Sequence, residues 1–163
     1  MINEFSSIYT DGTADSMTPL TALSMYDQFR ELTPVGRRGD RIIQRLADRL
    51  VEVDLLDRAS VLLDRQVKFR LRGKQKAIVG SKLALIRLLD RQPRLALDAL
   101  NESVSPGLDS RLALERKRLR SRSVFELGDS ESALKLIKND DSRKADLLRA
   151  VSYTHLRAHE TQP

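Results

Sequence analysis

The sequence predicts an all-α protein, and three observations lead to that prediction. Apolar residues make up 40% of the 163-residue chain, whereas aromatics make up only 4% and Trp is absent, so Leu, Ala, Ile and Val must form the core. Runs of Val, Ile, Tyr and Thr, which favour strands, are missing. Apolar residues recur at helical spacing, and this pattern itself repeats along the chain. We therefore expect one helical repeat domain.

The helical domain is expected to begin after a polar N-terminal segment. Residues 1–17 show no helical period and contain the turn-forming pair Asp11-Gly12, which predicts a disordered arm. Thr18 is a good N-cap residue, and Pro19 suits the first position of a helix because its missing N–H has no partner there. We therefore expect the first helix to start at this pair.

Two further helices are expected before residue 70. Pro34 and the glycines that follow it end the first helix, and Asp40 is placed to cap the next one. A turn near Val53-Asp54 then separates the second helix from the third. The apolar stripe of the second helix comprises Ile42, Ile43, Leu46, Ala47, Leu50 and Val51, and that of the third comprises Leu62, Leu63 and Val67.

A repeat with a period of 37 residues organises the rest of the chain. When the segments 53–65, 90–102 and 127–139 are superposed, small and large apolar positions fall into common columns. One helical hairpin cannot bury its own apolar face, so hairpins of such a repeat are expected to stack, with small residues where helices approach closely. The small columns are Ala59, Ala96 and Ala133, and Ala47, Ala84 and Ser121; a large column is Val51, Leu88 and Phe125.

These columns resemble the tetratricopeptide-repeat family, in its bacterial type. That family has a period of about 34 residues with small residues at the eighth and twentieth positions, and both small columns fit. The resemblance covers residues 18–150 and implies antiparallel helical hairpins stacked as a tetratricopeptide-like α-solenoid. The chain departs from the family by three extra residues per unit, by no glycine at the eighth position and by no aligned proline. An ordinary helical bundle remains the alternative.

The resemblance also implies a binding surface, because the first helix of each unit lines the inner surface in that family. The positions carried over are Arg41, Gln44 and Asp48, then Ile78, Ser81 and Leu85, then Glu115, Arg118 and Arg122. This surface, apolar in the middle and charged at both ends, would suit a peptide with an apolar anchor and charged flanks. The alternative is that Ile78 and Leu85 are core residues.

The C-terminal segment 151–163 is expected to be non-native. Its residues VSYTHLRAHET match, in one reading frame, the translation of a transposase-type sequencing adapter, and they hold the only two histidines, His155 and His159. The preceding segment 142–150 looks like the start of another hairpin, so we expect a truncated fragment of a longer repeat protein. The last hairpin is then expected to expose an apolar face at Leu134, Ile137, Leu147 and Leu148.

The remaining residues carry no sign of an enzyme. There is no cysteine, and outside the tail there is no histidine, so the usual thiolate nucleophile, general base and metal ligands are missing. The seven glycines form no phosphate loop, dinucleotide fingerprint or nucleophile elbow. Near pairs of acids, such as Asp140 and Asp141 or Glu126 and Asp129, fall at expected helix ends, where capping explains them. We expect neither a cofactor nor a metal.

Two basic clusters suggest an alternative function, the binding of nucleic acid or of an anionic membrane surface. The chain has 29 basic and 23 acidic residues, a net charge of +6, and such clusters can bind nucleic acid or an anionic membrane. Stacking aromatics are almost absent from them, and basic residues at helix ends are favoured by the helix dipole alone. The first cluster is Arg65, Lys68, Arg70, Arg72, Lys74 and Lys76; the second is Arg111, Arg116, Lys117, Arg118, Arg120 and Arg122.

The sequence therefore predicts a non-enzymatic scaffold that binds a protein or peptide partner, with the basic module as the alternative. No apolar run reaches the roughly 20 residues that cross a bilayer, so no membrane span is expected. The lack of cysteine fits a reducing compartment such as the cytoplasm but leaves the localisation unknown.

Overall fold

The computed structural model describes residues 2–160, which form nine α-helices and two short 3-10 helices without a strand. The prediction of an all-α protein is confirmed over this range. The chain divides into two compact units, Met1–Leu71 and Arg72–Pro163. Residues 1 and 161–163 lie outside the described range.

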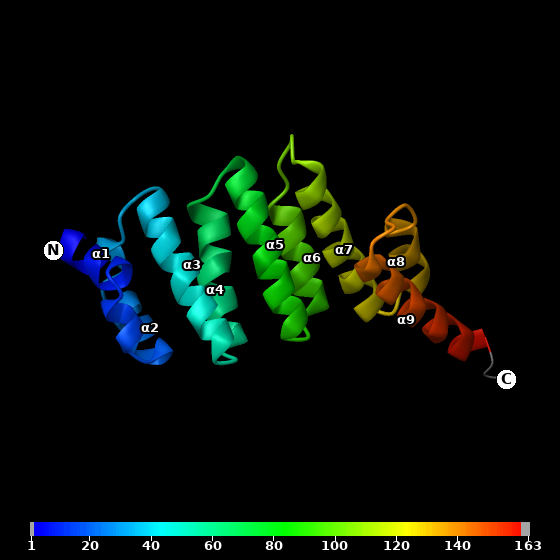
Figure 1. The fold of residues 1–163 in the computed structure, drawn as a ribbon, viewed down its shortest axis with the longest axis horizontal. Coiled ribbons are helices and arrows are strands. Elements are labelled where there is room, and N and C mark those ends of the chain that lie inside the picture. Colours follow the sequence, from blue (N-terminus) through cyan, green and yellow to red (C-terminus); the bar gives the residue numbers. More distant parts are fainter. Residues whose placement is uncertain (1, 161–163) are drawn as a thin grey trace. The chain divides into compact units, whose positions relative to one another are not determined.

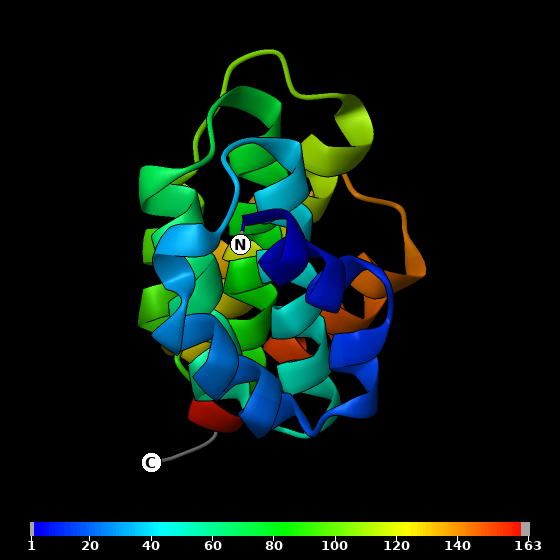
Figure 2. The same cartoon turned by 90° about the vertical axis from the view of Figure 1, so that its left-hand side faces the viewer.

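The first unit is a helical hairpin with a helical N-terminal segment packed on it. The hairpin helices α3 and α4 run antiparallel, and α1 and α2 both contact α3 (Figures 1 and 2). Thr18 accepts a hydrogen bond from the Thr21 N–H, so the predicted N-cap is confirmed. The elements are α1 (Ile2–Thr10), η1 (Thr13–Ser16), α2 (Pro19–Gln28), η2 (Arg30–Leu32), α3 (Arg37–Glu52) and α4 (Leu56–Phe69).

The N-terminal segment corrects the prediction of a disordered arm over residues 1–17. Phe5 and Tyr9 are 4% and 5% exposed, with ring centroids 5.2 Å apart, and the Tyr9 hydroxyl donates to the Ala22 carbonyl at 2.8 Å. Arg49 of α3 donates to the Ala14 carbonyl at 2.6 Å. The sequence did not predict this helix because most of its residues are polar. Only Phe5 and Tyr9, spaced i, i+4, indicate its buried face.

The second unit consists of two helical hairpins and a final helix. Helix α7 contacts both helices of the α5/α6 hairpin and also pairs with α8, and α9 contacts α7 and α8. Neighbouring hairpins of this unit therefore pack against each other, as Figure 1 shows in green and yellow. The elements are α5 (Gly73–Leu89), α6 (Pro93–Glu102), α7 (Ser110–Glu126), α8 (Ser130–Leu136) and α9 (Arg143–Glu160).

The helix boundaries repeat the 37-residue period. The first helices of the three hairpins end at Glu52, Leu89 and Glu126, and the second helices begin at Leu56, Pro93 and Ser130, in steps of 37 residues. The turns between them each hold one left-handed residue at the same phase, namely Asp54 (φ 61°), Arg91 (φ 55°) and Gly128 (φ 96°). The small columns are buried as predicted, with exposures of 0–1% at Ala47, Ala59, Ala84, Ala96, Ser121 and Ala133.

The last helix bears on two expectations about the C-terminal end. Leu147 is 68% exposed, as predicted, but Ile137 is only 1% exposed, because α9 packs beside α8 and Arg149 donates to the Ile137 carbonyl at 2.9 Å. Leu134 and Leu148 are half-buried. Helix α9 continues to Glu160, through most of the segment predicted to be non-native, and that prediction stays open. The side chains of His155 and His159 lie outside the described part of the chain.

Candidate protein-interaction surfaces

Helix α5 carries an exposed apolar stripe. Ile78, Leu85 and Leu89 are 38%, 40% and 49% exposed, and their spacing of seven and four residues places them on one face of the helix. Most aliphatic side chains of α5 are instead buried in the unit, for example Leu83 and Leu88 at 0–1%. The alternative interpretation of Ile78 and Leu85 as core residues is therefore wrong, and the stripe is open to solvent.

The neighbouring helix α7 places an ion pair near the Leu89 end of this stripe. Arg122 Nε lies 2.8 Å from Glu126 Oε1, and both side chains remain partly exposed. A hollow of about 410 Å³ connects them to α5 and the following turn, and its lining includes Leu88, Leu89 and Pro93. We call the surface formed by Ile78, Leu85, Leu89, Arg122 and Glu126 the α5–α7 face. Aliphatic side chains there lie next to one group of each charge.

Arg118, which the sequence placed on the binding surface, is instead held by the fold. Its Nε and Nη2 donate to the two carboxylate oxygens of Asp140 at 2.5 and 2.9 Å. Asp140 is 4% exposed and also accepts from the Ser142 N–H, so these bonds hold the pKa of its carboxyl far below the usual range. The pair connects α7 to the turn before α9, and Arg118 is committed to that connection.

Ser81 is also misplaced by the sequence prediction, because it is only 2% exposed. Its hydroxyl donates to the Ala77 carbonyl at 2.9 Å and accepts from Arg116 Nη1 at 3.2 Å. Arg116 further donates to the Leu100 carbonyl at 2.6 Å and to Ser103 Oγ at 3.2 Å, so one guanidinium joins α5, α6 and α7. In the sequence, only the small residues Ser81 and Ser103 mark this junction, and Arg116 belongs to the second basic cluster.

The three predicted contact residues of α3 belong to the first unit. Arg41 and Asp48 are exposed and Gln44 is half-buried, all on one face of the helix. Glu115 of α7 is exposed as well, in the second unit. The α5 and α7 members of the predicted surface lie on two contacting helices of the second unit.

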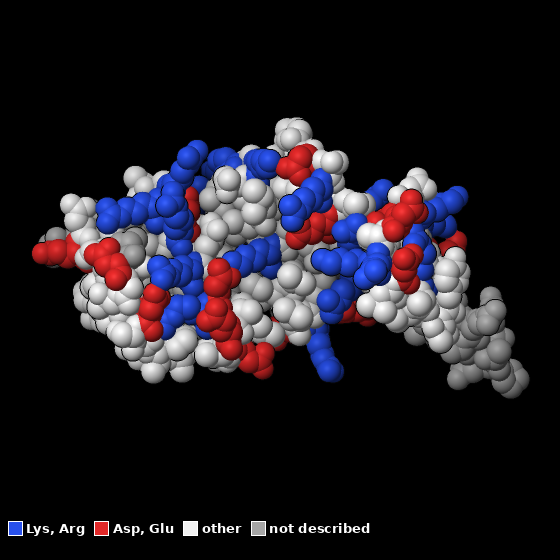
Figure 3. Space-filling view, in the orientation of Figure 1, with Lys and Arg blue, Asp and Glu red and all other residues white. Residues whose placement is uncertain are grey.

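Half of the first predicted basic cluster forms ion pairs within the fold. Three of its six residues form ion pairs: Lys68 with Asp64 at 2.8 Å, Arg70 with Asp40 at 2.9 Å, and Lys74 with Asp109 at 2.7 Å. Arg65, Lys68 and Arg70 belong to the first unit, whereas Arg72, Lys74 and Lys76 belong to the second. Figure 3 shows basic and acidic side chains interleaved on the face that it presents. This interleaving weakens the case for a polyanion-binding surface.

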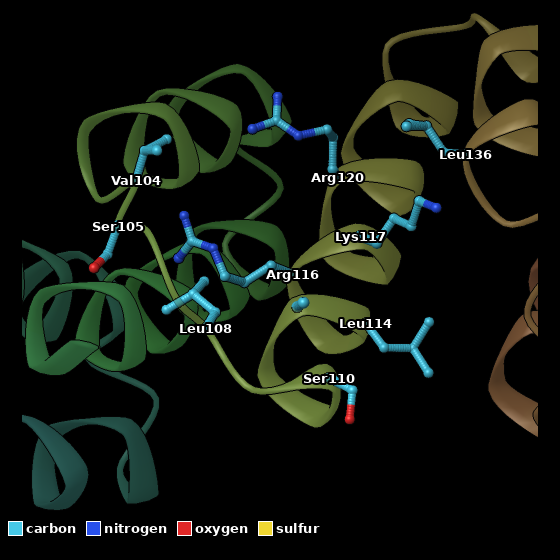
Figure 4. A pocket seen from close by; sticks show the side chains of 10 residues that line it. Val104, Ser105, Leu108, Ser110, Leu114, Arg116, Lys117, Arg120 and Leu136 are labelled. Atoms are coloured by element: carbon cyan, nitrogen blue, oxygen red, sulfur yellow. The ribbon is translucent and has the colours of Figure 1, made fainter. Parts of the chain in front are cut away.

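A second hollow, of about 700 Å³, lies along α7 and is here called the α7 groove (Figure 4). Its aliphatic lining comes from the α6–α7 loop, from α7 and from α8, and comprises Val104, Leu108, Ala113, Leu114 and Leu136. Its charged lining consists of Arg116, Lys117 and Arg120, and none of the described residues that line it is acidic or aromatic. In Figure 4, Arg116 points toward Val104 and Leu108, whereas Lys117 and Leu114 lie on the side of Leu136.

The electrostatics of the α7 groove are one-sided. Arg116 has only carbonyl and hydroxyl partners, and its burial, followed by the nearby charge of Arg120, lowers the pKa of its guanidinium. Arg120 donates to the amide oxygen of Asn101 at 2.8 Å, again a neutral group. Leu100 and Asn101 belong to the last turn of α6, where the helix dipole offsets only part of this positive charge.

Within residues that the structure describes, no group of three or more His, Asp or Glu is placed to hold a metal ion, and no helix is long and apolar enough to cross a membrane. Asp129 accepts from the Ser132 N–H at 2.9 Å, so its predicted capping role is confirmed, whereas Glu126 pairs with Arg122. Comparisons of the chain with family models, curated proteins and solved structures give no match.

Proposed function

We propose that this chain is a non-enzymatic interaction module that binds a segment of a partner protein on the α5–α7 face. The observation behind this proposal is the exposed stripe of Ile78, Leu85 and Leu89. Three aliphatic side chains on one helix face, next to a hollow, provide anchor positions for apolar side chains of a partner. The resemblance to tetratricopeptide repeats, which form interaction scaffolds, agrees with this proposal.

The charges beside the stripe suggest how such a segment would be oriented. Arg122 and Glu126 already satisfy each other at 2.8 Å, so a partner gains specificity there rather than much affinity. A segment with aliphatic residues toward α5 and a polar or charged flank toward α7 fits both parts of the surface. Binding strength is then expected to come from the α5 side.

The test is a selection of peptides from a random library on the full chain, followed by affinity measurement on variants. We expect the selected peptides to carry aliphatic anchors and to lose about threefold to tenfold in affinity on Leu85→Asp. Full burial of a Leu side chain contributes about 1.5–3 kcal/mol, and a partner can bury only the 40% of Leu85 that is exposed. Val61→Asp is the matched control, because Val61 is 51% exposed on α4 and is not one of the residues that form this face. Equal affinity for the two variants would refute the proposal.

A further inference from the structure

The α7 groove contains cationic side chains that have no acidic partner among the described residues. Lys117 has no ion pair or hydrogen bond among the described residues, and Arg120 bonds only the neutral Asn101 side chain. The Nε–H of Arg116 likewise donates to no described group, since its bonds are made by Nη1 and Nη2. Three cations with unused donors and no carboxylate in the lining form a site that is complementary to negative charge.

The apolar part of the groove indicates the kind of anion that fits. Val104 is 70% exposed, and Leu108, Leu114 and Leu136 are half-buried members of the lining, so aliphatic surface lies among the cations. Single-stranded nucleic acid is held by stacking its bases on aromatic side chains, and no described lining residue is aromatic. Aliphatic side chains together with carboxylates are instead what an acidic amphipathic peptide presents.

We propose that the α7 groove binds an acidic amphipathic segment of a partner protein, with its aliphatic side chains against Val104, Leu108 and Leu136 and its carboxylates on Lys117 and Arg120. Arg116 contributes its charge from a fixed position, because four bonds to α5, α6 and the following loop hold its guanidinium. Cations stand on both sides of α7 in the groove, so a segment that crosses it meets one on either side (Figure 4).

This site is separate from the α5–α7 face. Lys117 precedes Glu126 by nine residues, which is about half a turn out of phase at 3.6 residues per turn, so the two surfaces use opposite faces of α7. The proposal for the groove therefore does not rest on the proposed function of the other face. Each can fail while the other holds.

The test uses the full chain and three labelled probes in fluorescence anisotropy. The first probe is a synthetic helical peptide with Leu at i, i+3 and i+4 spacing and Glu elsewhere, the second replaces each Glu by Lys, and the third is an oligothymidylate of similar length. We expect saturable binding of the acidic peptide only. The double variant Lys117→Glu with Arg120→Glu is expected to weaken it about tenfold or more, since two attractive pairs become repulsive.

The control variant makes the same change in net charge outside the α7 groove. Arg94→Glu with Lys144→Glu reverses two exposed cations of the same unit that do not line the groove, and we expect less than about a threefold change. Val104→Ser keeps the charges and removes an apolar contact. We expect this variant to bind the acidic peptide more weakly, at high salt as well as at low salt. Equal losses in both double variants, or tighter binding of oligothymidylate, or an unaffected Val104→Ser would overturn the proposal.

Discussion

Replacement of Asp140 by Asn is expected to destabilise the second unit strongly. The carboxylate is 4% exposed and accepts two hydrogen bonds from Arg118, whose side chain is 22% exposed. Breaking a fully buried ion pair from one side costs about 3–5 kcal/mol, and the partial exposure of Arg118 lowers our expectation to about 2–3 kcal/mol. For a chain of this size, that loss corresponds to a fall in Tm of roughly 4–12 °C.

Thermal and urea unfolding followed by circular dichroism at pH 7 measure this loss. Asp141→Asn is the matched control, because Asp141 is the exposed neighbour in the same turn and its loss removes the same charge. If the two variants differ by less than about 0.5 kcal/mol, the carboxylate is not buried against Arg118 in the way described.

The pH dependence of the same pair has a definite sign. The pKa of the Asp140 carboxyl lies well below its usual value in the folded chain, mainly because Arg118 donates to it. Its contribution to stability is therefore complete above the unfolded pKa of about 3.9 and is lost as the pH falls toward the folded value. We expect the stability difference between the wild type and Asp140→Asn to shrink steadily below about pH 5, and a constant difference would contradict the assignment.

Two further predictions concern close packing and burial. Gly80→Ala is expected to lower the free energy of unfolding in urea by about 1–3 kcal/mol, because a Cβ there would lie 2.0 Å from Ser103 Oγ. At an open helix position the same substitution raises stability, so an increase would contradict the close packing of Gly80. Burial raises the pKa of Tyr9 to about 12, so the Tyr9 contribution to stability is complete below about pH 10 and is lost between about pH 10 and that value. Absorbance titration of tyrosinate checks this, and Tyr9→Phe is expected to remove the latest-titrating phase.

The sequence predicted the helices of the repeat and their period, because local rules decide both. The columns of Ala59, Ala96 and Ala133 reflect close helix contacts, and all three residues are 0% exposed. Thr18 marked a helix start through its side-chain hydroxyl, and Pro19 did so through its missing N–H. Such signals need only the residues on one element and its immediate neighbour, which is why they were visible without a structure.

The binding surfaces were predicted less well, because they depend on side-chain partners far apart in the sequence. Arg118 and Asp140 are 22 residues apart, and Arg116 reaches Ala77 across 39 residues. A basic residue in a cluster looks the same in sequence whether it faces solvent or holds three helices together. Of the three α5 positions that the resemblance placed on the surface, Ile78 and Leu85 are therefore exposed, whereas Ser81 is buried.

The left-handed turn residues have a consequence for how the chain tolerates insertions. Asp54, Arg91 and Gly128 adopt φ values of 61°, 55° and 96° at one phase of the repeat, although only the last is a glycine. A left-handed conformation costs a non-glycine residue about 1–2 kcal/mol, so the flanking helices, rather than the turn residue, impose the geometry. The hairpin then behaves as a module: duplicating or deleting one whole 37-residue segment keeps every turn in register, whereas each residue added within a helix rotates all that follows by about 100°.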